Sequence, residues 1–217
     1  MLVLSFCCHL QGREPFCLFI ETVAALPEDY SGKLQFFVSN RCEEIIARFL
    51  LSVLVLDQIS DPNMAVDMVI HLFYSVFLPK VYLEIIQGII KRFAELLEDG
   101  IYWPGGRPGY IKLSQSPWSH VVTLLQTWQH STLTMNSAQR EYDRMRNAPN
   151  REDYRERMYA SLRPSHRVAF LEFRQFGLVL PFGSLNAHFN APNVTLFSTD
   201  SGKWLQTDHA DPLNLFE

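Results

Sequence analysis

The densest run of one charged residue type lies in residues 140–174. This segment holds nine arginines, no lysine and six acidic residues, which gives it a net charge of +3. Arginine without lysine is typical of planar carboxylate or phosphate recognition and of protein interfaces. The interspersed acids favour another interpretation, in which the arginines pair with acidic side chains on solvated helices. The arginines are Arg140, Arg144, Arg146, Arg151, Arg155, Arg157, Arg163, Arg167 and Arg174.

A histidine and a serine of potentially catalytic type lie in an apolar stretch. His71 is flanked by Ile70 and Leu72, and Tyr74 and Ser75 follow. Valine follows the serine, so the glycine elbow that exposes the nucleophile of many hydrolases is missing. The apolar surroundings favour a core histidine that is hydrogen-bonded to a neighbour. The alternative is that Tyr74 and Ser75 line a pocket.

Histidine and aspartate side chains near the C-terminus raise the question of a metal site. Their spacings of 22, 12, 8 and 1 residues fit no known ligand pattern, so turns and solvated polar surface are the preferred interpretation. The residues are His166, His188, Asp200, Asp208 and His209. The four cysteines (Cys7, Cys8, Cys17 and Cys42) contain no CxxC pair. We therefore expect no metal.

Composition limits the class of protein. With 217 residues, 47% hydrophobic and 19% charged, the chain is typical of a globular protein large enough to bury a core without disulfides. Cysteines that act as small buried hydrophobes indicate a reducing compartment, so we expect a cytoplasmic protein. The apolar run Ile45–Leu56 is too short for a membrane span, which needs about 20 residues. The pI is about 6.0, and residues 1–99 carry a net charge of −6. Both values argue against nucleic-acid binding by the whole chain.

The elements that position these residues follow from hydrophobic periodicity. Strands are predicted at Leu2–Cys8 and Leu34–Ser39 with a helix at Phe16–Leu26 between them, which together form a parallel βαβ unit. Three helices follow, with Asp61-Pro62 as the start signal of the second and Gly100 as the stop signal of the third. Their predicted ranges are Glu43–Leu56, Asp61 to about Phe77, and Val81–Glu98.

The remainder of the chain divides into a helical part and a turn-rich tail. Helices are predicted at Pro117–Gln129, Thr134–Arg146, Arg151–Leu162 and Ser165–Gln175. Short strands are predicted at Leu178–Leu180 and Val194–Phe197. This pattern gives three parts: a βα part at 1–100, a helical part with the arginines at 101–176, and strands and turns at 177–217.

Several longer motifs resemble a family of uncharacterised domains. They are Tyr30–Leu34, Asn40-Arg41, Ile45–Leu51, Ile70–Pro79, Arg163–Phe170, Phe176–Gly183, His188–Asn190, Asn193 and Asp211–Leu213. The resemblance is to the domain at the N-terminus of the third axonemal dynein assembly factor and, more closely, to fungal proteins that often carry MYND zinc fingers. It implies a Rossmann-like, methyltransferase-like α/β fold with an unusually helix-rich middle, and no established activity. Related chains continue past residue 213, so the resemblance also predicts a front portion of a longer protein.

A Rossmann-like fold places a cofactor at specific positions. It requires glycines after the first strand and an acid after the second for the ribose hydroxyls. Gly12 is the single glycine available after the first strand, and Asn40 stands where an acid is usual. Glu43 is the nearest replacement for that acid. If a cofactor binds, we expect S-adenosylmethionine at Gly12, Asn40 and Glu43, and the alternative is that these residues form a turn, a strand end and a helix start.

The degraded cofactor motifs, together with an otherwise complete hydrophobic pattern, favour a non-catalytic module for protein interaction or assembly, with other proteins as partners. An S-adenosylmethionine-dependent methyltransferase is the alternative prediction. Nucleic-acid binding through residues 140–174 is a second alternative.

Overall fold

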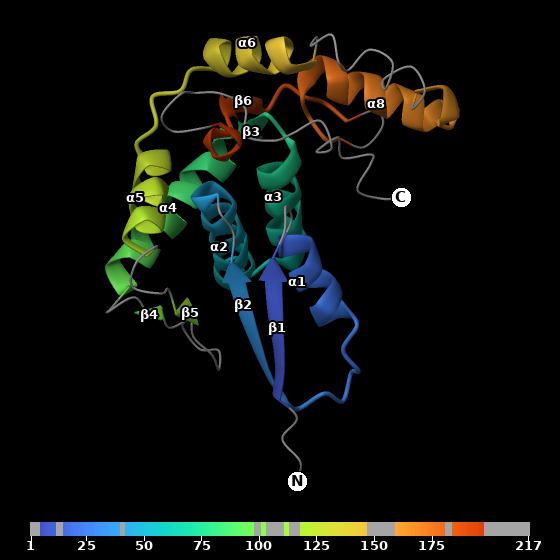
Figure 1. Ribbon diagram of the computed structural model, residues 1–217. Coiled ribbons are helices and arrows are strands. Elements are labelled where there is room, and N and C mark those ends of the chain that lie inside the picture. The colour runs from blue at the N-terminus through green and yellow to red at the C-terminus, as the bar shows by residue number, and fades with distance from the viewer. Residues whose placement is uncertain are drawn as a thin grey trace.

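The computed structural model describes residues 5–11, 15–39, 42–97, 101–102, 111–112, 118–146, 159–180 and 184–197. The chain is a mixed α/β protein in which helices predominate (Figure 1). Four helices form a bundle with a small parallel sheet against it, and two further helices run across one end of that bundle.

The N-terminal βαβ unit is confirmed. Strand β1 (Ser5–Gln11) pairs in parallel with β2 (Lys33–Ser39) along the full length of both, and α1 (Pro15–Ala24) connects them. Within the described ranges this sheet has two strands. A Rossmann-like core, which needs more parallel strands, therefore stays a prediction.

The central bundle consists of helices whose ends follow local signals. Asp61 caps α3 by accepting a hydrogen bond from the Asn63 backbone N–H at 3.0 Å, and proline occupies the first helical position. Glu43 and Glu44 lie in the first turn of α2, where the helix dipole favours negative charge. The four helices are α2 (Glu43–Gln58), α3 (Pro62–Tyr74), α4 (Lys80–Leu96) and α5 (Trp118–Gln129).

The prediction that the second of these helices continues to about Phe77 is wrong. Helix α3 ends at Tyr74, and Phe77–Pro79 forms strand β3, which pairs antiparallel with β6 (Phe189–Pro192). Hydrogen bonds with distant parts of the chain replace the helical ones at this point. The Val76 N–H donates to the Gly177 carbonyl at 2.7 Å, and the Val76 carbonyl accepts from the Asn193 N–H at 2.8 Å.

Helices α6 (Met135–Arg146) and α8 (Pro164–Phe176) lie end to end across the bundle (Figure 1). Their bounds lie within one residue of those predicted. Helix α8 ends at Gly177, which adopts the left-handed conformation with φ 67°. Of the predicted helix Arg151–Leu162, residues 151–158 lie outside the described residues, and 159–161 are helical.

The predicted strands of the tail are wrong. Val194–Leu196 forms a short 3₁₀ helix, η2, because the Asn193 carboxamide oxygen accepts from the Thr195 N–H and hydroxyl and bends the chain. Leu178–Leu180 lies outside any regular strand, since the Val179 N–H donates to the Ser75 hydroxyl. The one strand described in this region is β6.

A small antiparallel strand pair lies between α4 and α5 in the sequence. It consists of β4 (Ile101–Tyr102) and β5 (Ile111–Lys112). Among the described helices, none combines the length and the hydropathy that a membrane span requires. The predicted three-part division of the chain stays a prediction.

The described core forms two hydrophobic clusters. The larger one joins α1 to α5 around a group of phenylalanines, in which Phe16 stacks on Phe73 with ring centroids 5.0 Å apart. The smaller one joins β3, α6 and η2 and includes Val76, Tyr142 and Leu196. Residues 71–79 pass from the larger cluster to the smaller, so the end of α3 connects the two.

Substitution of Gly177 tests the connection between the two hydrophobic clusters. A Cβ at Gly177 would lie 2.9 Å from the Val76 Cβ, and the left-handed backbone costs a non-glycine residue about 1–2 kcal/mol on its own. We expect Gly177→Ala to lower the free energy of unfolding in urea by at least ~2 kcal/mol. Gly88→Ala is the matched control, because it lies within α4 with nothing near its Cβ and should raise stability by ~0.5–1 kcal/mol. Equal effects of the two substitutions would contradict this account.

Candidate functional site

The predicted cofactor residues fall in a region that the structure describes in part. Gly12 and Asn40 lie outside the described residues. Glu43 begins α2 just after the carboxyl end of β2, and its Oε1 lies 3.1 Å from Nδ1 of the exposed His120 on α5. The role of the three residues in binding a cofactor stays a prediction.

A thiol lies beside the carboxylate of the next residue, Glu44. The Cys42 Sγ donates to Oε2 of Glu44 at 3.0 Å. Burial and then this hydrogen bond raise the pKa of the Cys42 thiol above its ordinary value. The group is therefore held as a neutral thiol, which is the form that is poor at nucleophilic attack.

His71 is a core histidine, as predicted. Its side chain is buried, and Nδ1 lies 2.8 Å from the hydroxyl of the fully buried Ser75. The Ser75 oxygen also accepts from the Val179 N–H at 3.1 Å, so this hydroxyl is bonded on two sides. A serine that no solvent reaches cannot serve as a nucleophile towards an external substrate, which removes the hydrolase interpretation.

The outer side of His71 faces a small polar group at the surface. Nε2 of His71 lies 3.6 Å from Oδ1 of Asp67, and the hydroxyl of Tyr82 donates to Oδ2 of the same carboxylate at 2.6 Å. Burial, with a contribution from Asp67, raises the pKa of Tyr82 to about 12. Burial lowers the pKa of His71 and outweighs the opposing effect of the Asp67 charge, so the imidazole is neutral near pH 7.

Asn193 is the residue that sequence reasoning missed. Its side-chain N–H₂ group donates to the carbonyls of His71, Leu72 and Ser75 at 3.2, 2.8 and 2.8 Å. These carbonyls belong to the last turn and the end of α3. The His71 carbonyl also accepts from the Ser75 N–H, whereas the Leu72 carbonyl lacks its helical donor because the Val76 N–H donates to Gly177. Asn193 opens an N-x-T glycosylation sequon, but its side chain is fully buried and holds the fold instead. A capping residue more than a hundred positions away leaves no local signal.

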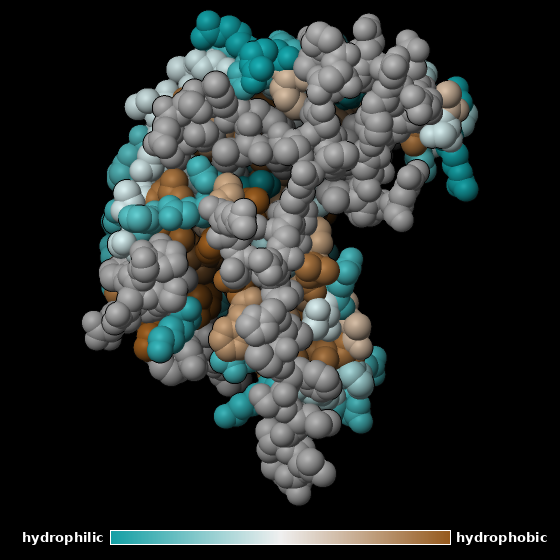
Figure 2. Space-filling model, in the orientation of Figure 1, coloured by the Kyte–Doolittle hydropathy of each residue, from teal (hydrophilic) through white to brown (hydrophobic). Residues whose placement is uncertain are grey.

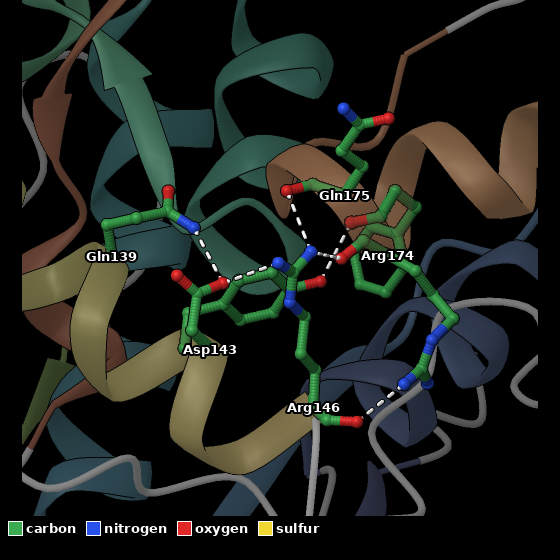
Figure 3. Close-up of polar contacts among 7 residues, drawn as sticks. Gln139, Asp143, Arg146, Arg174 and Gln175 are labelled. Carbon is green, nitrogen blue, oxygen red and sulfur yellow. Dashed lines mark hydrogen bonds and ion pairs between the residues drawn. The ribbon is translucent and has the colours of Figure 1, made fainter. Parts of the chain in front are cut away.

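Arginines join the C-termini of α6 and α8. The Arg146 guanidinium reaches from α6 and donates to the carbonyls of Arg174 and Gln175, at 2.5 and 3.0 Å (Figure 3). In return, Arg174 donates to the Arg146 carbonyl at 2.7 Å. Asp143 holds the Arg146 guanidinium from the same helix at 2.7 Å. We call this reciprocal pair the arginine clamp. It neutralises two helix C-termini whose partial negative charges face each other.

Other arginines of the segment are also engaged within the chain. Arg167 donates to the carbonyls of Leu162 and Ala160, and Arg144 forms a two-pronged pair with Glu141. Arg140 contacts the Ser137 hydroxyl at 3.4 Å. The predicted intramolecular pairing is confirmed for Arg144 and Arg146. The hydrogen bonds described for Arg167 and Arg174 are to backbone carbonyls. Arg151, Arg155 and Arg157 lie outside the described residues.

The predicted absence of a metal site concerns residues that are only partly described. Among the described residues, no three His, Cys, Asp or Glu side chains gather closely enough to hold an ion. His166 and His188 are exposed, and Asp200, Asp208 and His209 lie outside the described ranges.

The fold and its buried polar groups define a helix-rich α/β domain without a known catalytic constellation in its described part. Residues 17–78, from α1 to β3, match the model of a family described as a domain of unknown function (DUF4470). No curated protein and no solved structure matches the chain.

His71 makes stability depend on pH. Because its pKa is lowered from 6.5 in the folded protein, only the unfolded chain binds a proton here as the pH falls through 6.5. The free energy of unfolding should therefore fall on acidification from pH 7.5 to 5.5, by at most about 1.4 kcal/mol per pH unit from this group. His71→Gln should flatten this dependence in urea titrations. The same slope in wild type and His71→Gln would contradict the assignment.

The arginine clamp predicts an energetic link between α6 and α8. We expect Arg146→Gln and Arg174→Gln each to lower the free energy of unfolding by about 1–3 kcal/mol, because each removes charge-assisted hydrogen bonds to helix-end carbonyls. Arg140→Gln is the matched control on the same helix and should leave stability unchanged, since Arg140 is exposed and its contact to the Ser137 hydroxyl is long, at 3.4 Å. Strictly additive effects of the two clamp substitutions would show that the two arginines act separately.

Proposed function

We propose that this domain is a non-catalytic protein-interaction or assembly module that binds its partner through α1. The observation that carries the proposal is the composition of this helix. Its ten residues are Pro-Phe-Cys-Leu-Phe-Ile-Glu-Thr-Val-Ala, with apolar side chains on every side. A helix that is hydrophobic all round is normally buried, yet this one lies at the surface.

Three large apolar side chains of α1 remain accessible. Leu18, Ile20 and Val23 are 43%, 40% and 41% exposed and lie at different angles around the helix, and we call them the exposed α1 residues. The inner side of the helix is occupied by Phe16 and Phe19, which pack on Phe49 of α2. Figure 2 shows hydrophobic residues at the surface over this helix. Partly exposed apolar side chains that project from a firmly anchored helix are suited to burial against another protein.

The polar groups of the described chain support binding without catalysis. His71, Ser75 and Asn193 are buried and bonded to one another or to α3. The two guanidinium groups of the arginine clamp donate to carbonyls at the helix ends, so they are unsuited to phosphate recognition. Protein binding through apolar contact is therefore a better match to this chain than nucleic-acid binding through residues 140–174.

The resemblance to the assembly-factor domain and its fungal relatives agrees with an assembly role in the cytoplasm. The methyltransferase alternative has one observation in its favour. Parallel strands β1 and β2 end at the same edge, where Glu43 begins α2, and this is the edge at which Rossmann-like folds bind cofactors. The test therefore needs one arm for each function.

The first arm concerns the exposed α1 residues. Tagged wild-type protein is first used to capture a partner from cells that express this protein. The partner is then purified, and its affinity for wild type is compared with its affinity for the double variant Leu18→Ser/Val23→Ser. We expect at least a tenfold loss, because two apolar contacts disappear. Val81→Ser on α4, at a 60% exposed valine, is the control and should retain the affinity. Unchanged binding by the double variant would overturn the assignment of the surface.

The second arm concerns catalysis. Calorimetric titration of the chain with S-adenosylmethionine should show no saturable binding up to millimolar concentrations. Micromolar binding that Glu43→Ala abolishes would overturn the non-catalytic proposal in favour of a methyltransferase.

A further inference from the structure

A surface of apolar side chains extends from α1 onto α3. The rings of Phe16 on α1 and Phe73 on α3 are both buried and stack on each other, with centroids 5.0 Å apart. Figure 1 shows the two helices next to each other, in agreement with this contact. The stacked pair is therefore the point at which one surface passes from one helix to the other.

On each helix, a row of apolar side chains begins at this stacked pair and becomes exposed away from it. On α1, Ile20 and Val23 lie four and seven positions after the phenylalanine and are 40% and 41% exposed. On α3, Ile70 and Val66 lie three and seven positions before the phenylalanine and are 39% and 51% exposed. These spacings place each row along one side of its helix. We call these four residues the α1–α3 surface.

The charged residues of these two helices are acidic. Residues 15–32, which contain α1 and the turn after it, and residues 61–79, which contain α3, hold five Asp or Glu and no Lys or Arg. Glu21, Glu28 and Asp29 are exposed, and their carboxylates form no hydrogen bond or ion pair with another described residue. Negative charge beside exposed apolar side chains favours a positively charged partner.

The form of the α1–α3 surface favours a helical partner. Extended peptides bind mainly through backbone hydrogen bonds to the edge of a sheet. Helices α1 and α3 offer side chains instead, because helical N–H and C=O groups are bonded within the helix. Rows of apolar side chains at helical spacing pack against similar rows on another helix, as α1, α2 and α3 do in the described core.

We propose that the partner of this domain presents a basic amphipathic helix, whose apolar side covers the α1–α3 surface and whose Lys and Arg lie next to Glu21, Glu28 and Asp29. This inference rests on the proposed function and goes beyond it, because α3 joins the interface and the partner has a stated shape and charge. A second copy of this chain is a poorer match, since the arginine clamp and Arg144 are engaged within their own chain.

Fluorescence anisotropy with labelled peptides tests the charge and the shape of the partner. The first probe has leucines alternately three and four positions apart, with lysines between them. The second replaces the lysines by glutamates, and the third has the composition of the first in scrambled order. The full chain should bind the first probe saturably and at least about tenfold more tightly than the other two. No saturable binding of the first probe, or equal binding of the first and the second, would overturn the proposal.

A substitution on α3 tests the apolar part of the surface. Val66→Ser should weaken binding of the first probe and of the purified partner by at least about fivefold, because an apolar contact is lost. Leu171→Ser on α8, at a 49% exposed leucine, is the matched control and should retain both affinities. Circular dichroism checks that both variants are folded.

Neutral substitutions test the acidic part. The variant Glu21→Gln/Glu28→Gln/Asp29→Asn should weaken both affinities by at least about fivefold at low salt and reduce their dependence on salt. Glu172→Gln on α8 removes one negative charge from another element and should leave both affinities unchanged. Equal affinities in the neutral variant, the control and wild type would contradict the basic character of the partner.

The outcomes separate this inference from the proposed function. A partner whose affinity falls in Leu18→Ser/Val23→Ser but not in Val66→Ser or in the neutral variant would overturn the basic-helix inference and leave the exposed α1 residues as the binding site. Unchanged affinity in all three variants would overturn both.

Discussion

The end of α3 is the point on which the described fold depends. Three carbonyls there accept from the Asn193 side chain, and the Ser75 hydroxyl accepts from the Val179 N–H. The chain can leave the helix at Tyr74 only because these distant groups replace the helical hydrogen bonds. The same contacts direct Val76 into the second hydrophobic cluster and bring β6 against β3. Without them the two clusters would have no common boundary.

The arginine clamp solves a second problem of helix ends. Helices α6 and α8 meet at their C-termini, where unsatisfied carbonyls and negative partial charges would repel. Each helix supplies a guanidinium to the carbonyls of the other, so the excess of arginine in this part of the chain has a structural use. The clamp and the cap of α3 share one physical principle: side chains far apart in sequence satisfy the backbone groups that helices leave open.

Side chains that the fold does not use for its own packing indicate where function lies. His71 and Ser75 are buried and bonded to each other, whereas α1 keeps apolar side chains at the surface. The match of residues 17–78 to a family of unknown function covers α1 from Cys17 onward.

The sequence by itself determined the elements that local chemistry controls. Hydrophobic periodicity and the Asp61-Pro62 start predicted the helices to within a few residues, and the apolar surroundings of His71 predicted its burial. It could not predict where α3 ends, the contacts of the Asn193 side chain to α3 or the reciprocal carbonyl contacts of Arg146 and Arg174. Those depend on partners that lie close only in the folded chain, because a backbone group accepts whichever donor packing brings to it. Tertiary structure alone decided that Asn193 satisfies the end of α3 from more than a hundred residues away.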